Sequence, residues 1–573
     1  MITLATDLYL LVAAYGLAVA VSYAGLPVLG QGAFVAIGAF GTTQLAAHGA
    51  PLGVAVIAAV AIAAAAGYLV GFAATRLAGA PLALATWGLA WLAYTALVVF
   101  PNLGGGAQGL TRDTPARLVS PALGIRITLT PTVHVVIGAV IAVAVAVALA
   151  RTARGAWGLD LAALRTGPVL ADSLGVPVQR RRRTVLATTA ALGALGGAGT
   201  AVLLGVVAPA DYSPLLSLQL FVAVLVGGVA TWWGPALGVA ILAALPDTAD
   251  ALARAINVDA LRARSVLTAL LLVVVIVARG PVNRLVTSRR GVRRTSVAAT
   301  AAGPPECPGQ PTPPDVPLLE LHRVVTSYGG LRVLDGVDLE IRAGEVHALV
   351  GPNGSGKTTL LRVAAGVVRP GSGDVRIAGR PAPSRPGAAP RVRAGVARTL
   401  QRTVLLGGLD AGTQAAVAAR ARDTLALTGL RELLSTPRAT AATARRRGDA
   451  GEALRGIGLD HRSDEPADRL DSAEQRLLQV GRAVATGARA LLLDEPAAGM
   501  SATQRDRLAV ILRDLAAAGF GVLLVEHDMR LVSRVADRVT VLAEGRVLCT
   551  GTPDEVRADP AVALAYLGSG SPG

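Results

Sequence analysis

The sequence predicts a polytopic α-helical membrane domain followed by an α/β domain. The first half of the chain carries repeated apolar runs of roughly 17 to 25 residues, the length that crosses about 30 Å of hydrocarbon. From Leu318 onward, short β-rich runs alternate with helical ones, which is typical of an α/β domain. Within this second half, residues 351–358 read Gly-Pro-Asn-Gly-Ser-Gly-Lys-Thr, a complete phosphate-binding loop.

Composition supports the membrane assignment. Of 573 residues, 53% are hydrophobic and 16% are charged, and the mean hydropathy is +0.54, which is too apolar for a soluble protein of this length. The net charge of +16 is compatible with a nucleic-acid partner, but the arginines cluster just beside the apolar runs, as the positive-inside rule expects. We therefore expect a lipid bilayer as the partner of the first half, and no nucleic acid.

Apolar spans are predicted near residues 8–25, 28–48, 52–75, 82–100, 132–150, 184–208, 216–245 and 264–279. The arginines between 151 and 183, and those from 279 onward, place these flanks in the cytoplasm. The stretch 216–245 must then cross an even number of times. Gly227-Gly228 and the Trp-Trp-Gly-Pro of 232–235 interrupt it, so we expect two short or broken helices that line part of a solute pathway.

Changes in composition set the predicted domain boundaries. The membrane domain covers residues 1–287. Residues 288–317 are basic and then rich in proline and glycine, which predicts an extended linker. The α/β domain covers residues 318–573.

The phosphate-binding loop holds the chain's single lysine, Lys357, among 54 lysines and arginines. A compact ammonium can reach between the β- and γ-phosphates inside a tight turn where a planar guanidinium would not fit. A buried strand is expected before the loop and a helix after it, whose dipole adds to the phosphate cradle. The predicted ATP contacts are Gly351, Pro352, Asn353, Gly354, Ser355, Gly356, Lys357, Thr358 and Thr359, with the Thr358 hydroxyl on Mg²⁺.

A second motif supplies two carboxylates. Residues 491–496, Leu-Leu-Leu-Asp-Glu-Pro, read as a hydrophobic strand that ends in Asp494 and Glu495. Asp494 can hold Mg²⁺ through water. Glu495 can orient or deprotonate the water that attacks the γ-phosphate, as phosphoryl transfer to water requires.

Together with three further residues in the expected order, these motifs resemble the ATP-binding cassette (ABC) family. Tyr328 resembles the aromatic residue that stacks on adenine, Gln401 the glutamine of the loop that reaches the catalytic site and the metal, and His527 the switch histidine. The resemblance implies an α/β P-loop ATP-binding cassette domain that uses ATP and Mg²⁺. It also implies catalytic roles for Glu495, His527 and Gln401, and metal ligation by Thr358, Gln401 and Asp494.

The family's signature, usually Leu-Ser-Gly-Gly-Gln, falls on Leu470, Asp471, Ser472, Ala473 and Glu474. In the family this segment closes on the γ-phosphate bound by the opposite cassette, so Asp471 brings like charge toward phosphate. The same spacing also permits a capping box between Asp471 and Glu474. We expect the ATP site completed by this signature to be weakened, and the site built on this chain's own Lys357 and Glu495 to hydrolyse ATP beside a standard signature.

Glycine-rich segments of the first half, at 22–40, 103–110 and 226–238, resemble the permeases of branched-chain (hydrophobic) amino-acid importers. The cassette segments 397–401, 496–500 and 565–568 are similar to the ATPases of that family. Residues 155–177 form an amphipathic stretch that resembles the coupling segment of importer permeases, and a simple interfacial loop helix is the alternative.

The resemblance implies a permease fused to its cassette in the bacterial plasma membrane, with the ATP-binding domain in the cytoplasm. A full assembly would add a second permease and a second cassette and an extracytoplasmic substrate-binding protein. The second permease and cassette would come either from a copy of this chain or, as the asymmetric signature favours, from different chains. The implied substrates are branched-chain or other hydrophobic amino acids. Urea or short amides form an alternative substrate class, and an ABC exporter or a membrane ATPase that moves no solute are alternative functions.

Overall fold

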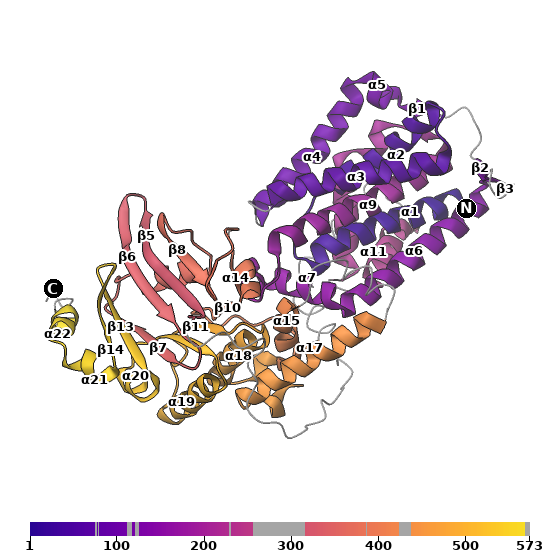
Figure 1. Cartoon of the computed structure of the whole chain (residues 1–573). Helices are drawn as coiled ribbons and strands as arrows, with labels where there is room; N and C mark the ends of the chain where they lie inside the picture. The colour runs from indigo at the N-terminus through magenta and orange to yellow at the C-terminus, as the bar shows by residue number, and fades with distance from the viewer. Residues whose placement is uncertain are drawn as a thin grey trace. The chain divides into compact units, whose positions relative to one another are not determined.

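The computed structural model describes residues 1–74, 77, 79–111, 117–120, 125–228, 231–255, 316–385, 387–422 and 437–567. The chain forms two compact units (Figure 1). The helical unit comprises Met1–Arg165 and Gln179–Val292, and the C-terminal unit comprises Thr166–Val178 and Arg293–Gly573. The short segment Thr166–Val178 is thus part of the C-terminal unit. The predicted span at 264–279 and residues 288–315 of the predicted linker lie outside the described residues, and the predicted domain boundaries stay predictions.

The helical unit is built mainly from apolar helices. They are α1 Ile2–Ala18, α2 Gln31–Ala47, α3 Leu52–Ala74, α4 Ala80–Val99, α5 Pro101–Gly104, α6 Pro131–Arg154, α7 Ala156–Thr166, α9 Val178–Leu204, α10 Pro214–Val226 and α11 Gly234–Ala255. Two short antiparallel pairs join them, β1 Leu110–Thr111 with β4 Val206–Val207 and β2 Arg117–Ser120 with β3 Ile125–Thr128. Within the described residues, five helices are long and apolar enough to cross a membrane: Ile2–Tyr23, Leu52–Ala73, Ala80–Val99, Pro131–Ala153 and Val178–Leu204. Each overlaps a predicted span.

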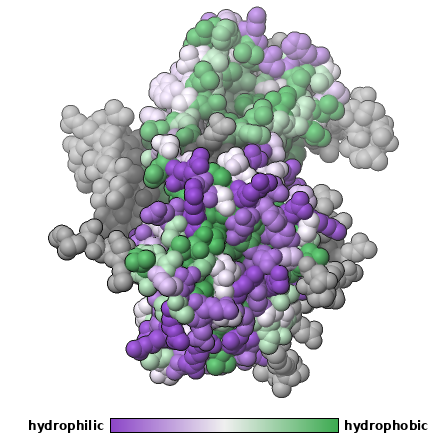
Figure 2. All heavy atoms as spheres, turned by 60° about the vertical axis from the view of Figure 1, so that its left-hand side comes forward, coloured by the Kyte–Doolittle hydropathy of each residue, from purple (hydrophilic) through white to green (hydrophobic). Residues whose placement is uncertain are grey.

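Burial separates the inner helices from the outer ones. The apolar windows of α1 and α9 are 61% and 67% buried, whereas those of α3, α4 and α6 are 22%, 17% and 28% buried. Figure 2 shows hydrophobic side chains over much of the visible surface of the helical unit and mainly hydrophilic ones on the C-terminal unit. An apolar face of this kind suits contact with lipid, which supports the membrane assignment.

Small residues let the inner helices approach closely. A Cβ placed on Gly38 of α2 would lie 2.0 Å from the carbonyl oxygen of Ala194 in α9. The buried Gln31 also joins three helices, because its Nε2 donates to the carbonyl oxygens of Ala13 at 3.0 Å and Thr189 at 3.2 Å. Helices in a membrane usually pack through close backbone contact and polar side chains, because the hydrophobic effect does not drive helices together in lipid.

Two breaks interrupt the helices. The break expected within 216–245 is confirmed, since α10 ends at Val226 and α11 begins at Gly234. The other break was not predicted: α1 continues as a π-helical turn, Val19–Tyr23, and the chain stays non-helical up to α2. Side chains satisfy freed backbone groups there, because Thr86 Oγ1 accepts from the Leu29 N–H at 3.0 Å and Ser217 Oγ from the Gly32 N–H at 2.8 Å.

The C-terminal unit confirms the predicted α/β domain. Its six-stranded sheet has the order β10-β11-β12-β7-β13-β14, parallel except for the pair β13–β14. These strands are β7 Val346–Val350, β10 Val396–Arg398, β11 Ala490–Asp494, β12 Gly521–Val525, β13 Arg538–Ala543 and β14 Arg546–Gly551. A four-stranded antiparallel sheet has the order β6-β5-β8-β9, with β5 Leu319–Tyr328, β6 Leu331–Ile341, β8 Ser372–Ile377 and β9 Arg380–Pro381.

Helices accompany these two sheets along the C-terminal unit. They are α8 Pro168–Ser173, α13 Lys357–Ala364, α14 Ala388–Ala394, α15 Ala411–Ala419, α17 Pro437–Gly456, α18 Ser472–Ala485, α19 Ala502–Ala517, α20 Met529–Val535, α21 Pro553–Ala558 and α22 Pro560–Leu567. Every residue of β7, β11 and β12 is buried, as expected for central parallel strands.

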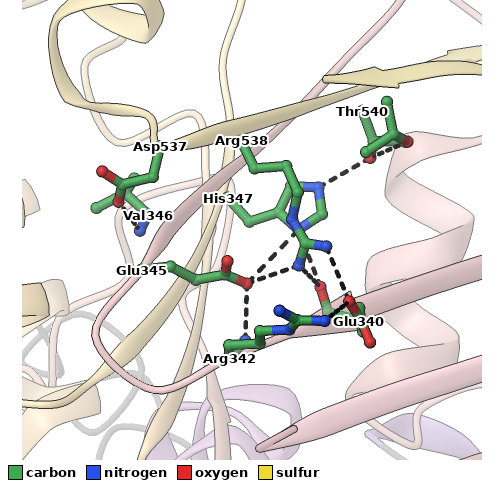
Figure 3. A network of polar contacts seen from close by, with 9 residues as sticks. Glu340, Arg342, Glu345, Val346, His347, Asp537, Arg538 and Thr540 are labelled. Carbon is green, nitrogen blue, oxygen red and sulfur yellow. Dashed lines mark hydrogen bonds and ion pairs between the residues drawn. The ribbon is translucent and has the colours of Figure 1, made fainter. Parts of the chain in front are cut away.

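A polar network braces the central strand β7 (Figure 3). The buried ring of His347 contacts the Glu340 carbonyl oxygen through Nδ1 at 2.9 Å and Thr540 Oγ1 through Nε2 at 2.8 Å. Arg538 on β13 donates to the carboxylates of Glu340 at 2.9 Å and Glu345 at 2.8 Å. The network ties β6, β7 and β13 together. It thereby fixes the strand that leads into the phosphate-binding loop.

Candidate active site

The phosphate-binding loop leaves the carboxyl end of β7 and enters α13 at Lys357. Gly351 has φ +151°, and a Cβ there would lie 2.0 Å from the Leu542 carbonyl oxygen, so the turn requires glycine. The Lys357 Nζ donates to the carbonyl oxygens of Gly351 at 2.7 Å and Pro352 at 2.8 Å. Burial lowers the pKa of Lys357, and the negative charges of Glu495 and Asp494 oppose that change. The lysine and both predicted carboxylates therefore act on one another.

Strand topology brings the second motif to the loop. The sheet places β12 between β7 and β11, all three parallel, so their carboxyl ends share one edge. Glu495 follows β11 and His527 follows β12, and the His527 Nε2 lies 3.0 Å from the Glu495 Oε1. Glu495 has φ +50°, a conformation that is strained for a non-glycine residue and is found at functional sites more often than elsewhere.

Two polar side chains that were not predicted as site residues hold Glu495 in place. Glu526 Oε1 accepts from the Ala497 N–H at 2.7 Å, and burial raises the pKa of Glu526. Arg476 on α18 donates from Nη1 to the Glu495 carbonyl oxygen at 3.1 Å. Glu526 directly precedes His527 and Arg476 lies two residues after the signature, but no spacing rule in the sequence distinguishes them from surface residues.

Asp494 is also fixed by the last residue of β10 and the residue after it. Arg398 Nη2 donates to Asp494 Oδ2 at 2.9 Å, and the two side chains are 11% and 1% exposed. Thr399 Oγ1 accepts from the Asp494 N–H at 3.1 Å. Gln401 follows two residues later and is exposed, as is Tyr328 at the end of β5, which is 45% exposed. Their predicted roles stay predictions.

These residues fit a magnesium ion that arrives with a nucleotide. Thr358, Gln401 and Asp494 offer hydroxyl, amide and carboxylate oxygens, the hard ligands that Mg²⁺ prefers. Among the described residues there is no cluster of three or more His, Cys, Asp or Glu that would hold a metal by itself. The remaining ligands would therefore be phosphate oxygens and water.

The signature segment forms the capping box that its spacing permits. Asp471 Oδ1 accepts from the Glu474 N–H at 2.8 Å, and Glu474 Oε2 accepts from the Asp471 N–H at 3.0 Å. Arg462 holds the other oxygen of Glu474, with Nη1 3.3 Å from Oε1. Two carboxylates thus satisfy the N–H groups at the start of α18. Leu470 and Ala473 are buried, while Ser472 is exposed.

Segment Thr166–Val178 docks on α14, the helix that precedes the strand carrying Arg398. The carboxylate of Asp172, on α8, accepts from the N–H groups of Ala388 at 2.5 Å and Ala389 at 3.1 Å and so caps α14. Burial raises the pKa of Asp172, although these two bonds oppose the change. Arg393 of α14 donates to the Gly175 carbonyl oxygen at 2.7 Å. After α14, the chain turns through a single glycine into β10.

Comparison with known protein families covers both halves of the chain. Residues 1–276 match the permease component of branched-chain amino acid transport systems. Residues 334–498 match the ABC transporter family, and residues 546–571 match a segment of branched-chain amino acid ATP-binding cassette transporters.

Individual relatives match the C-terminal half. The chain is 35% identical over 253 residues to the high-affinity branched-chain amino acid transport ATP-binding protein LivG of Salmonella typhimurium, covering 44% of this chain and 98% of LivG. It is 34% identical to BraF of Pseudomonas aeruginosa over the same shares. The ribose import ATP-binding protein RbsA 2 of Rubrobacter xylanophilus is 33% identical over 260 residues, which are 44% of this chain and 46% of RbsA 2.

Among solved structures, the ADP conformation of MJ1267, an ATP-binding cassette of an ABC transporter, aligns with a TM-score of 0.39 and 25% identity over 44% of this chain and 99% of MJ1267.

The sequence matches cover both the helical half and the cassette half. The chain therefore belongs to the branched-chain amino acid ABC transporter family, and it carries the permease and the ATP-binding cassette of that family in one polypeptide.

Proposed function

We propose that this chain is a subunit of a bacterial plasma-membrane importer that takes up branched-chain or other hydrophobic amino acids and hydrolyses ATP. The single observation that carries the proposal is the presence, in one chain, of a permease match and a cassette whose Lys357, Asp494, Glu495 and His527 meet at one sheet edge. The RbsA 2 match indicates that the cassette alone does not decide the substrate. The amino-acid assignment rests on the permease match and on the LivG and BraF relatives.

In the proposed reaction, the loop amides and the Lys357 ammonium bind the β- and γ-phosphates of ATP. Glu495 orients the attacking water and takes its proton, and His527, 3.0 Å from Glu495, holds that carboxylate and faces the γ-phosphate. Thr358, Gln401 and Asp494 would hold Mg²⁺, which when bound would supply positive charge to the phosphate oxygens. Glu526 and Arg476 keep the strained backbone of Glu495 in the geometry that the reaction needs.

Coupling to transport is proposed to run through residues 155–177. In its first half, Asp160 of α7 pairs with Arg181 of α9 at 2.5 Å, and Arg165 donates to the Ser22 carbonyl oxygen at 3.3 Å. The second contact joins the segment to the break between α1 and α2, where a helix can bend at least cost. In its second half, Asp172 caps α14 of the cassette.

The capping box supports a functional asymmetry. We propose that Asp471 and Glu474 satisfy the N–H groups of α18 that would otherwise receive a γ-phosphate, and that they add negative charge. The ATP site that this signature completes would then be the weaker of two. Such a chain requires a second permease and a second cassette that differ from it, together with an extracytoplasmic binding protein, and its own cassette faces the cytoplasm.

The test is uptake of labelled leucine by cells that express the chain with its candidate binding protein and partner subunits. Native protein should accumulate leucine, whereas Lys357→Ala, which loses phosphate binding, and Glu495→Gln, which keeps binding but loses the base, should not. Glu452→Gln, an exposed glutamate on α17, is the matched control and should behave as native. No leucine uptake alongside intact ATPase activity would contradict the amino-acid assignment, and urea and short amides would be assayed next.

A further inference from the structure

Arg398 pairs with the metal carboxylate and lies three residues before Gln401, on the strand that follows α14. The segment Thr166–Val178, called the docking segment below, contacts α14 itself. Arg398 is the last residue of β10, and its guanidinium donates to Asp494 Oδ2 at 2.9 Å. Asp494 is the carboxylate expected to hold Mg²⁺. The family motif that located Gln401 gave no role to this arginine.

The pair is poorly suited to a purely structural role. Both side chains are largely buried, yet the Nε–H of Arg398 is buried without an acceptor among the described residues. A buried ion pair with an unsatisfied donor adds little to stability, because desolvation of the charges is not fully offset. A polar group kept in such a position calls for another explanation.

Electrostatics supply that explanation. A guanidinium bound to one oxygen of Asp494 partly neutralises the negative charge of the carboxylate, so the carboxylate attracts a cation less strongly. The guanidinium also repels a divalent ion placed at the other oxygen. The Asp494 side chain is only 1% exposed and its backbone N–H is fixed by Thr399, so burial and this hydrogen bond would still restrain its orientation without Arg398. Loss of Arg398 would therefore remove the repulsion while leaving the metal ligand in place.

Arg398 is also connected to the docking segment by the backbone. Asp172 caps the start of α14, and Gly395, with φ +110°, is the single residue between α14 and β10. The three residues of β10 pair with β11 in register up to Arg398 opposite Leu492. A displacement of α14 thus reaches the guanidinium through four residues, Gly395 and the three of β10, without crossing a flexible loop.

We propose that Arg398 is a positioning residue that weakens the hold of Asp494 on Mg²⁺ and couples that hold to the position of α14. The inference rests on the proposed function, since it needs a metal–nucleotide site at Asp494. The docking segment would act on the metal carboxylate through Arg398, in addition to any effect on Gln401.

The test measures binding of Mn²⁺, a paramagnetic substitute for Mg²⁺, by electron paramagnetic resonance on the full chain in detergent with a non-hydrolysable ATP analogue. Arg398→Gln and Arg398→Met, which retains the length of the side chain, should each bind Mn²⁺ about tenfold more tightly, within the range by which neighbours of metal ligands change metal affinity. Arg398→Lys, which keeps the charge, and Arg513→Gln, which breaks an exposed pair with Asp537, should match the native chain.

Equal or weaker Mn²⁺ binding by both neutral variants would overturn the proposal. In a double-mutant cycle, Asp172→Ala should change the Mn²⁺ affinity of the native chain and leave that of Arg398→Gln unchanged, and additive effects would refute the coupling. Failure of the proposed function would look different, because the native chain itself would then bind no Mn²⁺ with the nucleotide.

Discussion

The buried ring of His347 makes cassette stability depend on pH. Burial, aided by the charge of Arg538, lowers the pKa of His347 from 6.5 to about 4. The folded state therefore excludes a proton that the unfolded chain binds. The contribution of His347 to the free energy of unfolding is fully present above pH 6.5. It decreases as the pH falls from 6.5 to about 4 and changes no further below that. The full difference corresponds to about 3 kcal/mol, and about 2 kcal/mol of it is lost by about pH 5.

Hydrogen exchange of the β7 amides is the appropriate assay, because slowly exchanging core amides report the free energy of global opening. Tryptophan fluorescence would not serve, since all five tryptophans lie in the helical half. The comparison is between the native chain and His347→Gln, a neutral replacement, at about pH 7.5 and about pH 5. The native cassette should lose about 2 kcal/mol more than the variant between the two conditions. An equal loss in both proteins would show that His347 does not cause the pH dependence, since the other titrating groups are common to both.

Three further predictions concern packing, docking and the signature. Gly38→Ala should lower the free energy of unfolding of the helical unit by about 2 kcal/mol or more in a thermal melt, because the new methyl group meets the α9 backbone. Gly53→Ala, with open space around it, is the control and should change little. Asp172→Ala removes the cap of α14 and should cost about 1 to 2 kcal/mol there, so leucine uptake should fall more than ATPase activity. Asp471→Ser should raise the ATPase rate of the full assembly several-fold if the signature is weakened, and an unchanged rate measured by phosphate release would contradict the asymmetry.

The fold was predictable where it depends on composition and motif order. Long apolar runs predicted the spans, and the loop around Lys357 with the carboxylates after β11 predicted the cassette and the sheet edge of its site. The π-helical turn after α1 was not predicted, since hydropathy does not distinguish a π-helix from an α-helix. Arg398, Glu526 and Asp172 were missed for another reason. Their partners are distant in sequence, and an arginine or a carboxylate in a short motif reads as a surface residue until the fold supplies the contact.

The C-terminal unit includes a segment, Thr166–Val178, that is translated long before the rest of the unit, and this delays its final packing. Asp172 leaves the ribosome 216 residues before Ala388, which it caps. At about 5 to 20 residues per second, roughly ten to forty seconds separate the two. During that interval Leu170, Leu174 and Val176, all buried in the finished unit, have no cassette to pack against. The membrane half is therefore synthesised with one segment of the C-terminal unit already inside it. Folding of the cassette is complete only when it packs against this segment, which was translated long before the first strand of the cassette.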